Sequence, residues 1–170
     1  MHFSEDPHIT RFVPHIAATT RDETPYVWAV DAARAPDYWF PRQCPRGLAW
    51  VEPTTTETDR LAILGPGAER VHLIEYSWLP RLQTVRLFAY RFDAAHFQPY
   101  SDDRTSHAFV SPRAVQPLGP PEPVPDLLDL HEQAGIELRL ARSLWPWWRA
   151  VITSTVGFSS IRLRNAGSQP

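Results

Sequence analysis

The sequence predicts an α+β fold, with a mostly antiparallel sheet and a few helices packed on it. Short stretches with strand-like alternation recur along the chain, and proline or glycine bounds most of them. Segments that carry helix-capping residues are fewer and fall between these stretches. The chain shows no internal repeat, and its one biased tract is a proline-rich hinge over residues 118–125. This mixture of many strands with few helices is typical of α+β domains.

In the N-terminal third, the pattern predicts strands over residues 1–6, 9–15 and 25–30, with a polar loop at residues 18–24. The residue before Pro7 favours extended geometry, which ends the first strand. Residues 31–40 predict a short helix that begins at Asp31, whose carboxylate can cap free backbone amides. Pro36 lies within the first turns, so this helix is expected to be irregular.

In the middle third, residues 47–53 predict a strand, residues 54–64 a capped helix or a loop leading into one, and residues 65–69 a turn. Residues 70–79 and 82–92 are expected to form two long neighbouring strands, separated by Pro80 and Arg81. The second of these strands carries bulky side chains on both faces, which predicts a central position in the sheet.

In the C-terminal third, a loop is expected at residues 96–106 and a strand with a proline-punctuated edge at residues 107–118. A helix over residues 121–135 should stop at Gly135. A second helix over residues 143–154 should be capped by Ser143, with Pro146 in its first turn. Strands are predicted over residues 136–141 and 158–165.

Composition limits the classes of function. The chain has 170 residues, which suits one domain over residues 1–170, and a net charge of -2. This balance gives no overall attraction to duplex nucleic acid or to a membrane surface. No 18-residue apolar run is present, and the N-terminus lacks the basic and apolar parts of a signal peptide, so we expect a cytoplasmic protein. All 17 basic residues are arginine, which excludes lysine Schiff-base and lysine general-base mechanisms.

Metal binding and nucleophilic catalysis find little support. The seven histidines lack the close spacings that place two imidazoles on one metal, so no metal site is expected. Cys44 is the only cysteine and has arginines beside it, which cannot accept its proton. A structural cysteine is therefore the favoured interpretation. A Ser-His-Asp hydrolase is also unsupported, because no GxSxG elbow is present.

Several arginines lie close to the predicted strands. Arg42 and Arg46 flank Cys44, while Arg139 and Arg162 fall within C-terminal strands. An arginine that faces inward is costly unless it is paired. Arg139 or Arg162 is therefore expected to bond a carboxylate such as Glu137 or Glu75, or else an anionic ligand, and structural pairing is the more frequent outcome.

The segment of residues 27–46 reads VWAVDAARAPDYWFPRQCPR and raises the possibility of a ligand-binding surface. Tyr38, Trp39 and Phe40 are about 100° apart around a helix axis, so they cannot all face the same way. At least one should serve the core, and one is free to face a cleft together with Trp28.

The first strand carries His2, which could donate a hydrogen bond to a ribose or phosphate, with Ser4 on the same face. The alternative for His2 is a surface histidine close to a terminus.

Two resemblances add to these observations. The order HFSEDPHITRFVPH, VWAVDAARAPDYWFPRQCPR, HAFVSPRAVQP, IELRLARSLWP and FSSIRLRNA resembles a bacterial protein family of unknown function over nearly the whole chain. This resemblance implies no activity.

The first 50 residues are also similar to the nucleotide-binding half of ADP-ribosyltransferases of the diphtheria-toxin type. In those enzymes a first-strand histidine holds the NAD ribose, and two aromatic residues about eleven apart sandwich the nicotinamide. The resemblance implies the first role for His2, the first aromatic position for Trp28 and the second for Tyr38 or Trp39. Stacking on a flat, partly cationic ring suits these side chains.

The chain departs from that family at two points. Phe3 and Ser4 follow the histidine, where the family usually has glycine and then serine or threonine. Ser106, His107 and Ala108 stand where the family has a glutamate, which argues against transfer of ADP-ribose to a protein side chain. Relatives that act on RNA 2'-phosphates use arginines instead, so His107 with Arg104 or Arg113 is a candidate catalytic site.

The sequence therefore predicts an ADP-ribosyltransferase-like domain that binds NAD or another nucleotide-like ligand. His2, Ser4, Trp28, Tyr38, Trp39 and Arg42 are the predicted binding residues, and His107 is the predicted catalytic residue. The alternative is a non-enzymatic binding or interaction domain that uses exposed aromatic residues, with a homodimer as one form of assembly. A small hydrolase built on His107 with Asp102 or Asp103 is a third and remote option.

Overall fold

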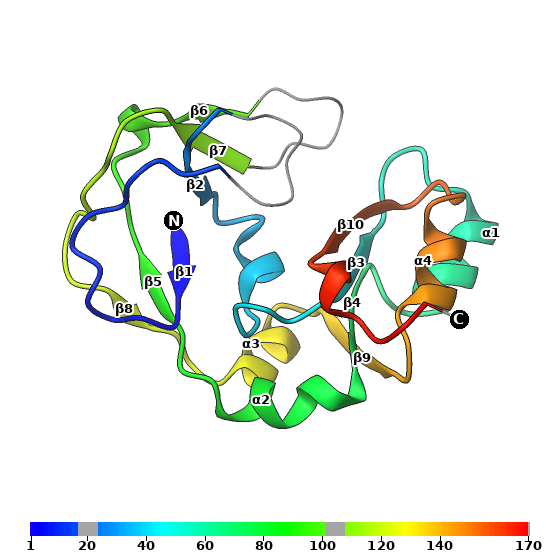
Figure 1. Cartoon of the computed structure of the whole chain (residues 1–170). Helices are drawn as coiled ribbons and strands as arrows, with labels where there is room; N and C mark the ends of the chain where they lie inside the picture. Colours follow the sequence, from blue (N-terminus) through cyan, green and yellow to red (C-terminus); the bar gives the residue numbers. More distant parts are fainter. Residues whose placement is uncertain (17–23, 101–107, 170) are drawn as a thin grey trace. The chain divides into compact units, whose positions relative to one another are not determined.

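The computed structural model describes residues 1–16, 24–100 and 108–169. Backbone contacts divide the chain into two compact units, and each unit combines two segments that are distant in sequence (Figure 1). Unit 1 comprises Met1–Trp39 and Arg86–Val124, and unit 2 comprises Phe40–Val85 and Pro125–Pro170. The expectation that residues 1–170 form one domain stays a prediction.

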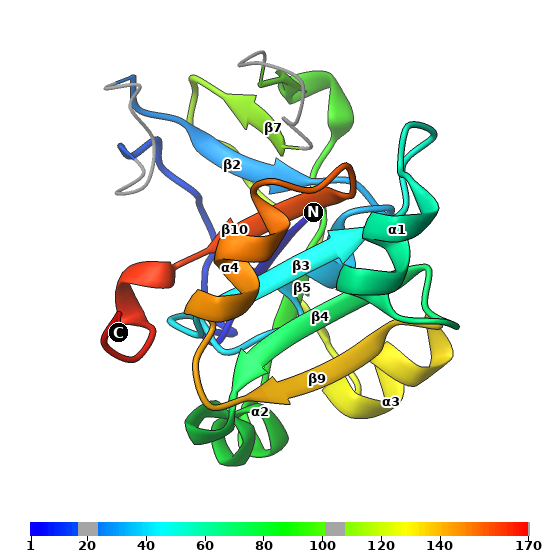
Figure 2. The same ribbon diagram turned by 90° about the vertical axis from the view of Figure 1, so that its right-hand side faces the viewer.

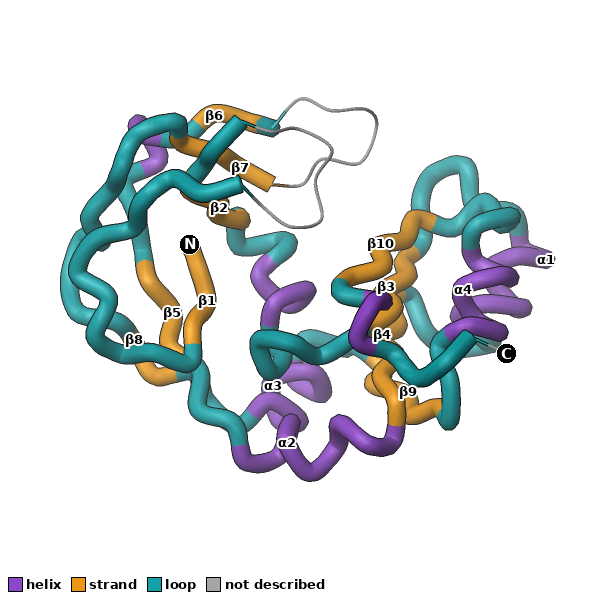
Figure 3. Tube along the Cα trace, viewed as in Figure 1, coloured by secondary structure: helices purple, strands orange, loops and turns teal. Residues whose placement is uncertain are grey.

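Unit 1 contains two small antiparallel sheets joined by long loops (Figure 3). One has the order β1 (His2–Ser4), β5 (Phe88–Tyr90) and β8 (Glu122–Pro123). The other has the order β2 (Val27–Val30), β7 (Ala108–Ser111) and β6 (Gln98–Pro99). The described residues of unit 1 also form two 3-10 helices, Ala35–Tyr38 and Ala94–His96.

An aromatic core holds unit 1 together. Phe12, Val27, Tyr90 and Val115 are buried and pack as one cluster. The Tyr90 hydroxyl donates to the Asp6 carbonyl at 2.6 Å and accepts from the Ile9 amide at 3.1 Å. The core residue at the end of β5 therefore also fastens the loop that follows β1.

Unit 2 is built on one four-stranded sheet (Figure 2). Its order is β10 (Gly157–Ile161), β3 (Arg46–Trp50), β4 (Arg70–Glu75) and β9 (Glu137–Ala141). The pairing of β4 with β9 is parallel, and the other two pairings are antiparallel.

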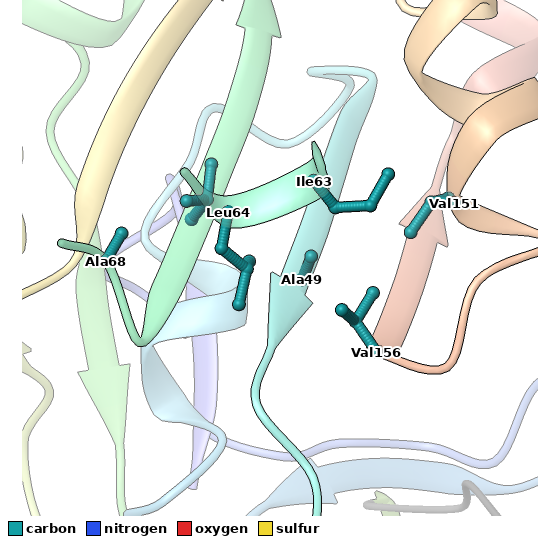
Figure 4. Packing of buried hydrophobic residues seen from close by; sticks show 7 residues of the cluster. Ala49, Ile63, Leu64, Ala68, Val151 and Val156 are labelled. Carbon is teal, nitrogen blue, oxygen red and sulfur yellow. The ribbon is translucent and has the colours of Figure 1, made fainter. Parts of the chain in front are cut away.

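Helices cover both faces of this sheet (Figures 1 and 2). One face holds α4 (Trp145–Val151) and the short α1 (Glu57–Asp59), which continues into a π-helical turn, Arg60–Leu64. The opposite face holds α3 (Leu127–Gln133). On the side of α1 and α4, an apolar cluster fills the space between helices and strands (Figure 4). Its buried members are Ala49, Ile63, Leu64, Ala68, Val71, Val151 and Val156.

The predicted α+β class is confirmed, and so are most of the predicted helix signals. The helix expected over residues 121–135 starts later than predicted: α3 begins after Asp126, whose carboxylate accepts from the Leu128 and Asp129 amides. It ends just before Gly135, whose φ of 65° is the left-handed geometry expected of a helix stop. The Ser143 hydroxyl accepts from the Trp145 amide at 3.3 Å, at the start of α4.

The two long neighbouring strands predicted over residues 70–79 and 82–92 are wrong in their boundaries and their pairing. The chain leaves β4 through a 3-10 turn, Tyr76–Trp78, and enters α2 (Leu79–Thr84), with Pro80 in its first turn. Proline is tolerated there because that position needs no amide donor. β5 pairs with β1 and β8 instead of β4, although its predicted central position is confirmed.

Several other expected elements are shorter than predicted, among them β7 (Ala108–Ser111), where a strand was expected over residues 107–118. The helix over residues 31–40 is reduced to the 3-10 turn Ala35–Tyr38, although the Asp31 carboxylate does accept from the Arg34 amide at 2.9 Å. The strand over residues 9–15 is reduced to two isolated bridges, Phe12 to Val115 and His15 to Tyr26. Most of the predicted loop 18–24 lies outside the described residues. Among the described residues, no helix is long and apolar enough to cross a membrane.

Gly47 on β3 offers a test of packing in unit 2. A Cβ atom at this position would overlap the indole ring of Trp147 on α4. We expect Gly47→Ala to lower the free energy of unfolding by about 1–3 kcal/mol, because overpacking forces side chains and backbone to shift. Urea unfolding followed by circular dichroism measures this change.

The matched control is Gly67→Ala, where an added Cβ would have no neighbour within 4 Å. This variant should unfold at nearly the wild-type urea concentration. Equal stability of the two variants would contradict the close approach of α4 to β3.

Candidate functional site

The structure brings His2 and Trp28, two of the predicted binding residues, next to each other in unit 1. The Met1 amino group donates to the Val30 carbonyl at 2.6 Å, which holds β1 beside β2. His2 Nδ1 lies 3.0 Å from the Trp28 carbonyl oxygen. Because a carbonyl only accepts, Nδ1 carries the proton in this hydrogen bond. The imidazole also packs against Phe12, at 5.0 Å between ring centroids, so two contacts set its orientation.

The indole of Trp28 lies in an aromatic cluster. Its ring makes edge contacts with Tyr100 at 4.8 Å and with Tyr26 at 6.1 Å between centroids. The indole nitrogen Nε1 is buried and has no hydrogen-bond partner among the described residues. A buried donor without a partner is uncommon in folded proteins, and the Trp147 indole nitrogen and the Ser160 hydroxyl share this property.

The three rings that follow β2 differ in their surroundings, although only Tyr38 lies within the 3-10 helix Ala35–Tyr38. Phe40 is 3% exposed and belongs to the core of unit 2, whereas Tyr38 is 37% exposed. Trp39 is partly buried, and its amide donates to the Pro36 carbonyl at 3.2 Å. The expectation that at least one ring serves the core is therefore confirmed for Phe40.

The remaining predicted site residues are spread over the chain. Ser4 is buried, and its hydroxyl accepts from the Asp6 amide at 3.1 Å, which closes the turn after β1. Arg42 is exposed on the segment before β3 and belongs to unit 2. His107, Asp102, Asp103 and Arg104 lie outside the described residues. The roles assigned to all of these residues in binding and catalysis stay predictions.

Arg139 on β9 is paired, as expected for an inward-facing arginine. Its Nε donates to the Glu137 carboxylate at 2.7 Å, which confirms one of the two predicted partners. The guanidinium also donates to the carbonyls of Ile63 and Leu64. Arg139 therefore ties the end of the π-helical turn to the sheet.

Cys44 has the character of a structural residue. Its thiol is fully buried, and the sulfur lies 3.5 Å from the Pro45 carbonyl. Burial raises the pKa of the Cys44 thiol to about 12, although the nearby Arg46 guanidinium acts in the opposite direction. A thiol held protonated in this way is a poor nucleophile.

Arg46 on β3 is itself a buried cation. One of its nitrogens donates to the Cys44 carbonyl at 3.1 Å, and its guanidinium carbon lies 5.0 Å from the centre of the Phe40 ring. Both contacts favour a desolvated guanidinium, the second through the negative face of the ring. Arg46 therefore holds the segment of residues 40–45 on the sheet.

Glu75, at the end of β4, is a buried carboxylate that binds backbone amides. It accepts from the Leu144 amide at 3.3 Å and from the Gly167 amide at 3.0 and 3.1 Å. The Trp145 indole donates to the Gly167 carbonyl at 2.7 Å. Glu75 thus fastens both the start of α4 and the C-terminal segment to the end of the sheet.

A chain of hydrogen bonds through two buried histidines connects β4 with α3. Arg70 Nε donates to His72 Nε2 at 3.2 Å, and His72 Nδ1 lies 3.0 Å from His131 Nε2. His131 Nδ1 lies 2.6 Å from the Leu127 carbonyl oxygen. The Phe40 ring packs against both imidazoles. The distance between ring centroids is 5.6 Å to His72 and 5.2 Å to His131.

Sequence reasoning did not identify this pair. His72 and His131 are 59 positions apart, and no local pattern relates them. A weak signal exists in α3, where Leu127 and His131 are four residues apart and both buried, so they share one helix face. Among the described residues, no group of three or more histidine, cysteine, aspartate or glutamate side chains is placed to hold a metal ion.

The burial of Cys44 can be tested by thiol reactivity. With a pKa of about 12, only about one thiol in ten thousand is ionised at about pH 8. We expect an aromatic disulfide reagent to react far more slowly with the native protein than with the protein in urea, by at least about 100-fold. Absorbance of the released thiolate measures both rates, and Cys44→Ala provides the blank. Equal rates would contradict the burial of this side chain.

Comparison with known proteins gives one finding. Residues 1–166 match a family model described as a family of unknown function, DUF6886. Neither the search of curated proteins nor the search of solved structures gave a significant match. The match confirms the whole-chain resemblance to a family of unknown function, whereas the ADP-ribosyltransferase resemblance and a bacterial origin stay predictions. This chain therefore belongs to the DUF6886 family.

Proposed function

We propose that this chain is a cytoplasmic protein whose unit 1 binds NAD or another nucleotide-like ligand through His2 and Trp28. The observation that supports the proposal is the hydrogen bond of 3.0 Å between the His2 imidazole and the Trp28 carbonyl. It joins the first strand to the aromatic strand, and these are the two elements on which the ADP-ribosyltransferase resemblance depends.

The two side chains have complementary roles in this proposal. Because its Nδ1 proton is engaged by the Trp28 carbonyl, the neutral His2 ring has a defined orientation and keeps Nε2 as an acceptor for a ribose hydroxyl. The indole offers a flat surface for a base or a nicotinamide ring, and stacking of this kind is worth about 1–3 kcal/mol per base. The buried Nε1 donor of Trp28 favours a ligand that brings a hydrogen-bond acceptor.

The proposed function is binding, with no assigned reaction. The sequence has Ser106, His107 and Ala108 where the resembling transferases have their glutamate. His107 stays the candidate for any catalytic step, and Tyr38 or Trp39 stays the candidate for the second stacking ring.

Ligand binding should raise the melting temperature. A thermal-shift screen compares NAD, ADP-ribose, mononucleotides and RNA with terminal phosphates. A ligand at 100 times its dissociation constant adds about 2.7 kcal/mol to the free energy of unfolding. Such a gain shifts the melting temperature by several degrees for a domain of this size. Isothermal titration calorimetry then gives the affinity of any ligand that produces a shift.

Variants connect a positive result to the proposed residues. Trp28→Ala should weaken binding by about 5- to 150-fold, the equivalent of one lost stacking interaction. His2→Ala should weaken it by about fivefold, the equivalent of one hydrogen bond. His8→Ala, at an exposed histidine of the same unit, and Trp148→Ala, in unit 2, are the controls and should bind normally. Wild-type affinity in both His2→Ala and Trp28→Ala would refute the proposed site.

An interaction domain without enzymatic activity is the second candidate function. Large apolar side chains are exposed in unit 1, namely Val13, Ile16 and Leu118. If these side chains form one contiguous patch, a partner would be expected to cover it. If the chain uses them in a homodimer, size-exclusion chromatography with light scattering should give twice the monomer mass. Leu118→Asp should then shift the mass toward the monomer, while a wild-type monomer at all concentrations argues against the homodimer.

A further inference from the structure

The hydrogen-bond chain through His72 and His131 has one direction. At its first end is an arginine, which only donates, and at its other end is a carbonyl, which only accepts. The Nε proton of Arg70 therefore points at His72 Nε2, so this imidazole carries its proton on Nδ1 and donates to His131 Nε2. His131 in turn carries its proton on Nδ1 and donates to the Leu127 carbonyl. Both imidazoles are neutral, and both are the Nδ1–H tautomer.

We propose that the His72–His131 pair is a pH-sensitive latch, which holds α3 against β4 while both rings are neutral and releases it in mild acid. The two residues belong to unit 2, on elements that are adjacent in space and distant in sequence. Imidazole is the side chain whose ordinary pKa lies between about pH 5 and 8, so the two histidines alone can make the latch respond to mild acid.

Added protons have no suitable position in this chain. A proton on His72 Nε2 would face the Nε–H group of Arg70, and a proton on His131 Nε2 would face the Nδ1–H group of His72. In either case two donors would oppose each other, and one hydrogen bond of the chain would be lost. The side chains are 0% and 1% exposed, so water cannot replace the lost partner without local opening.

The one charge with a resolved effect on His131, the Arg70 guanidinium, opposes its protonation. Asp126, Asp129 and Glu132 on α3 are exposed to solvent, where their fields are screened. The segments packed around the pair also carry other charged or titratable residues, namely Cys44, Arg46, Glu75, Arg81, Glu137 and Arg139.

The Arg46, Glu75 and Arg139 side chains each have structural contacts. The Glu75 carboxylate binds the amides of Leu144 and Gly167, and Arg139 binds Glu137 on the face of the sheet that holds the π-helical turn. Arg46 lies over the Phe40 ring and adds positive charge to the region. Cys44 stays a neutral thiol throughout the acid range because burial raises its pKa to about 12.

The direction of the pH dependence follows from His131. Burial and the Arg70 charge lower the pKa of His131, while the Leu127 carbonyl raises it by a smaller amount. The unfolded chain, with a histidine pKa of about 6.5, therefore binds a proton more readily than the folded chain does. The stability contributed by the neutral pair is fully present above about pH 6.5 and falls as the pH decreases below that value.

Urea unfolding at about pH 7.5 and about pH 5.5 tests the latch. If one histidine resists protonation, the folding equilibrium constant should decrease by up to about tenfold between these values. His131→Gln is the informative variant, because its amide has an acceptor for His72 and a donor for the Leu127 carbonyl but does not titrate. This variant should lose most of the pH-dependent decrease. His8→Gln replaces an exposed histidine and should keep the wild-type decrease.

A second measurement examines the native protein directly. Nitrogen chemical shifts of the imidazoles should identify His72 and His131 as Nδ1–H tautomers at about pH 7.5. The proposal is overturned if His131→Gln keeps the full pH dependence, or if either buried ring is the Nε2–H tautomer. If His131→Gln does not fold, the tautomers of the wild-type protein alone decide the question.

Discussion

The parallel pairing of β4 with β9 is the interaction on which unit 2 depends, because it joins two segments that are far apart in sequence. His72 lies beside Leu138 in this pairing, Leu73 beside Arg139 and Glu75 beside Ala141. Successive side chains of a strand point to opposite faces, so His72 reaches α3 on one side while Arg139 and Glu75 reach the helices on the other. Polar side chains of the strand pair therefore contact α3, the π-helical turn and the start of α4.

Buried or partly buried polar groups are costly, and the structure gives each of these groups a structural role. Arg139 satisfies carbonyls at the end of the π-helical turn, Glu75 satisfies amides at the start of α4, and His131 satisfies a carbonyl within α3. A polar group buried without a partner would destabilise the fold by about 1–3 kcal/mol. Unit 2 therefore has the properties of a scaffold. Its thiol, Cys44, is buried and protonated, so it is a poor nucleophile.

Unit 1 differs in how its polar and aromatic groups are used. Its sheets are small, and aromatic side chains supply much of its core. His2 and Trp28 meet through a main-chain carbonyl, which leaves the indole ring to the cluster with Tyr26 and Tyr100. The proposed ligand site and the proposed acid-sensitive latch thus belong to different units, and each can be altered by substitution without touching the residues of the other.

Local signals in the sequence determined the α+β class, most of the strands and the ends of the main helices. Asp126, Gly135 and Ser143 act through residues one to three positions away, so their effects are readable without knowledge of the rest of the chain. The pairing of Arg139 with Glu137 was predictable for the same reason. The two residues are two positions apart on one strand, so their side chains point to the same face.

Only the tertiary structure decided the division into two units, the helical path after β4 and the contact between His72 and His131. Each of these features depends on which distant segments meet, and hydrophobic periodicity along the chain does not encode that choice. The two neighbouring strands predicted on either side of Pro80 and Arg81 show this clearly. The chain forms α2 after β4, and β5 has its hydrogen-bonding partners in β1 and β8. Local propensity set the elements, and long-range pairing decided which of them became neighbours.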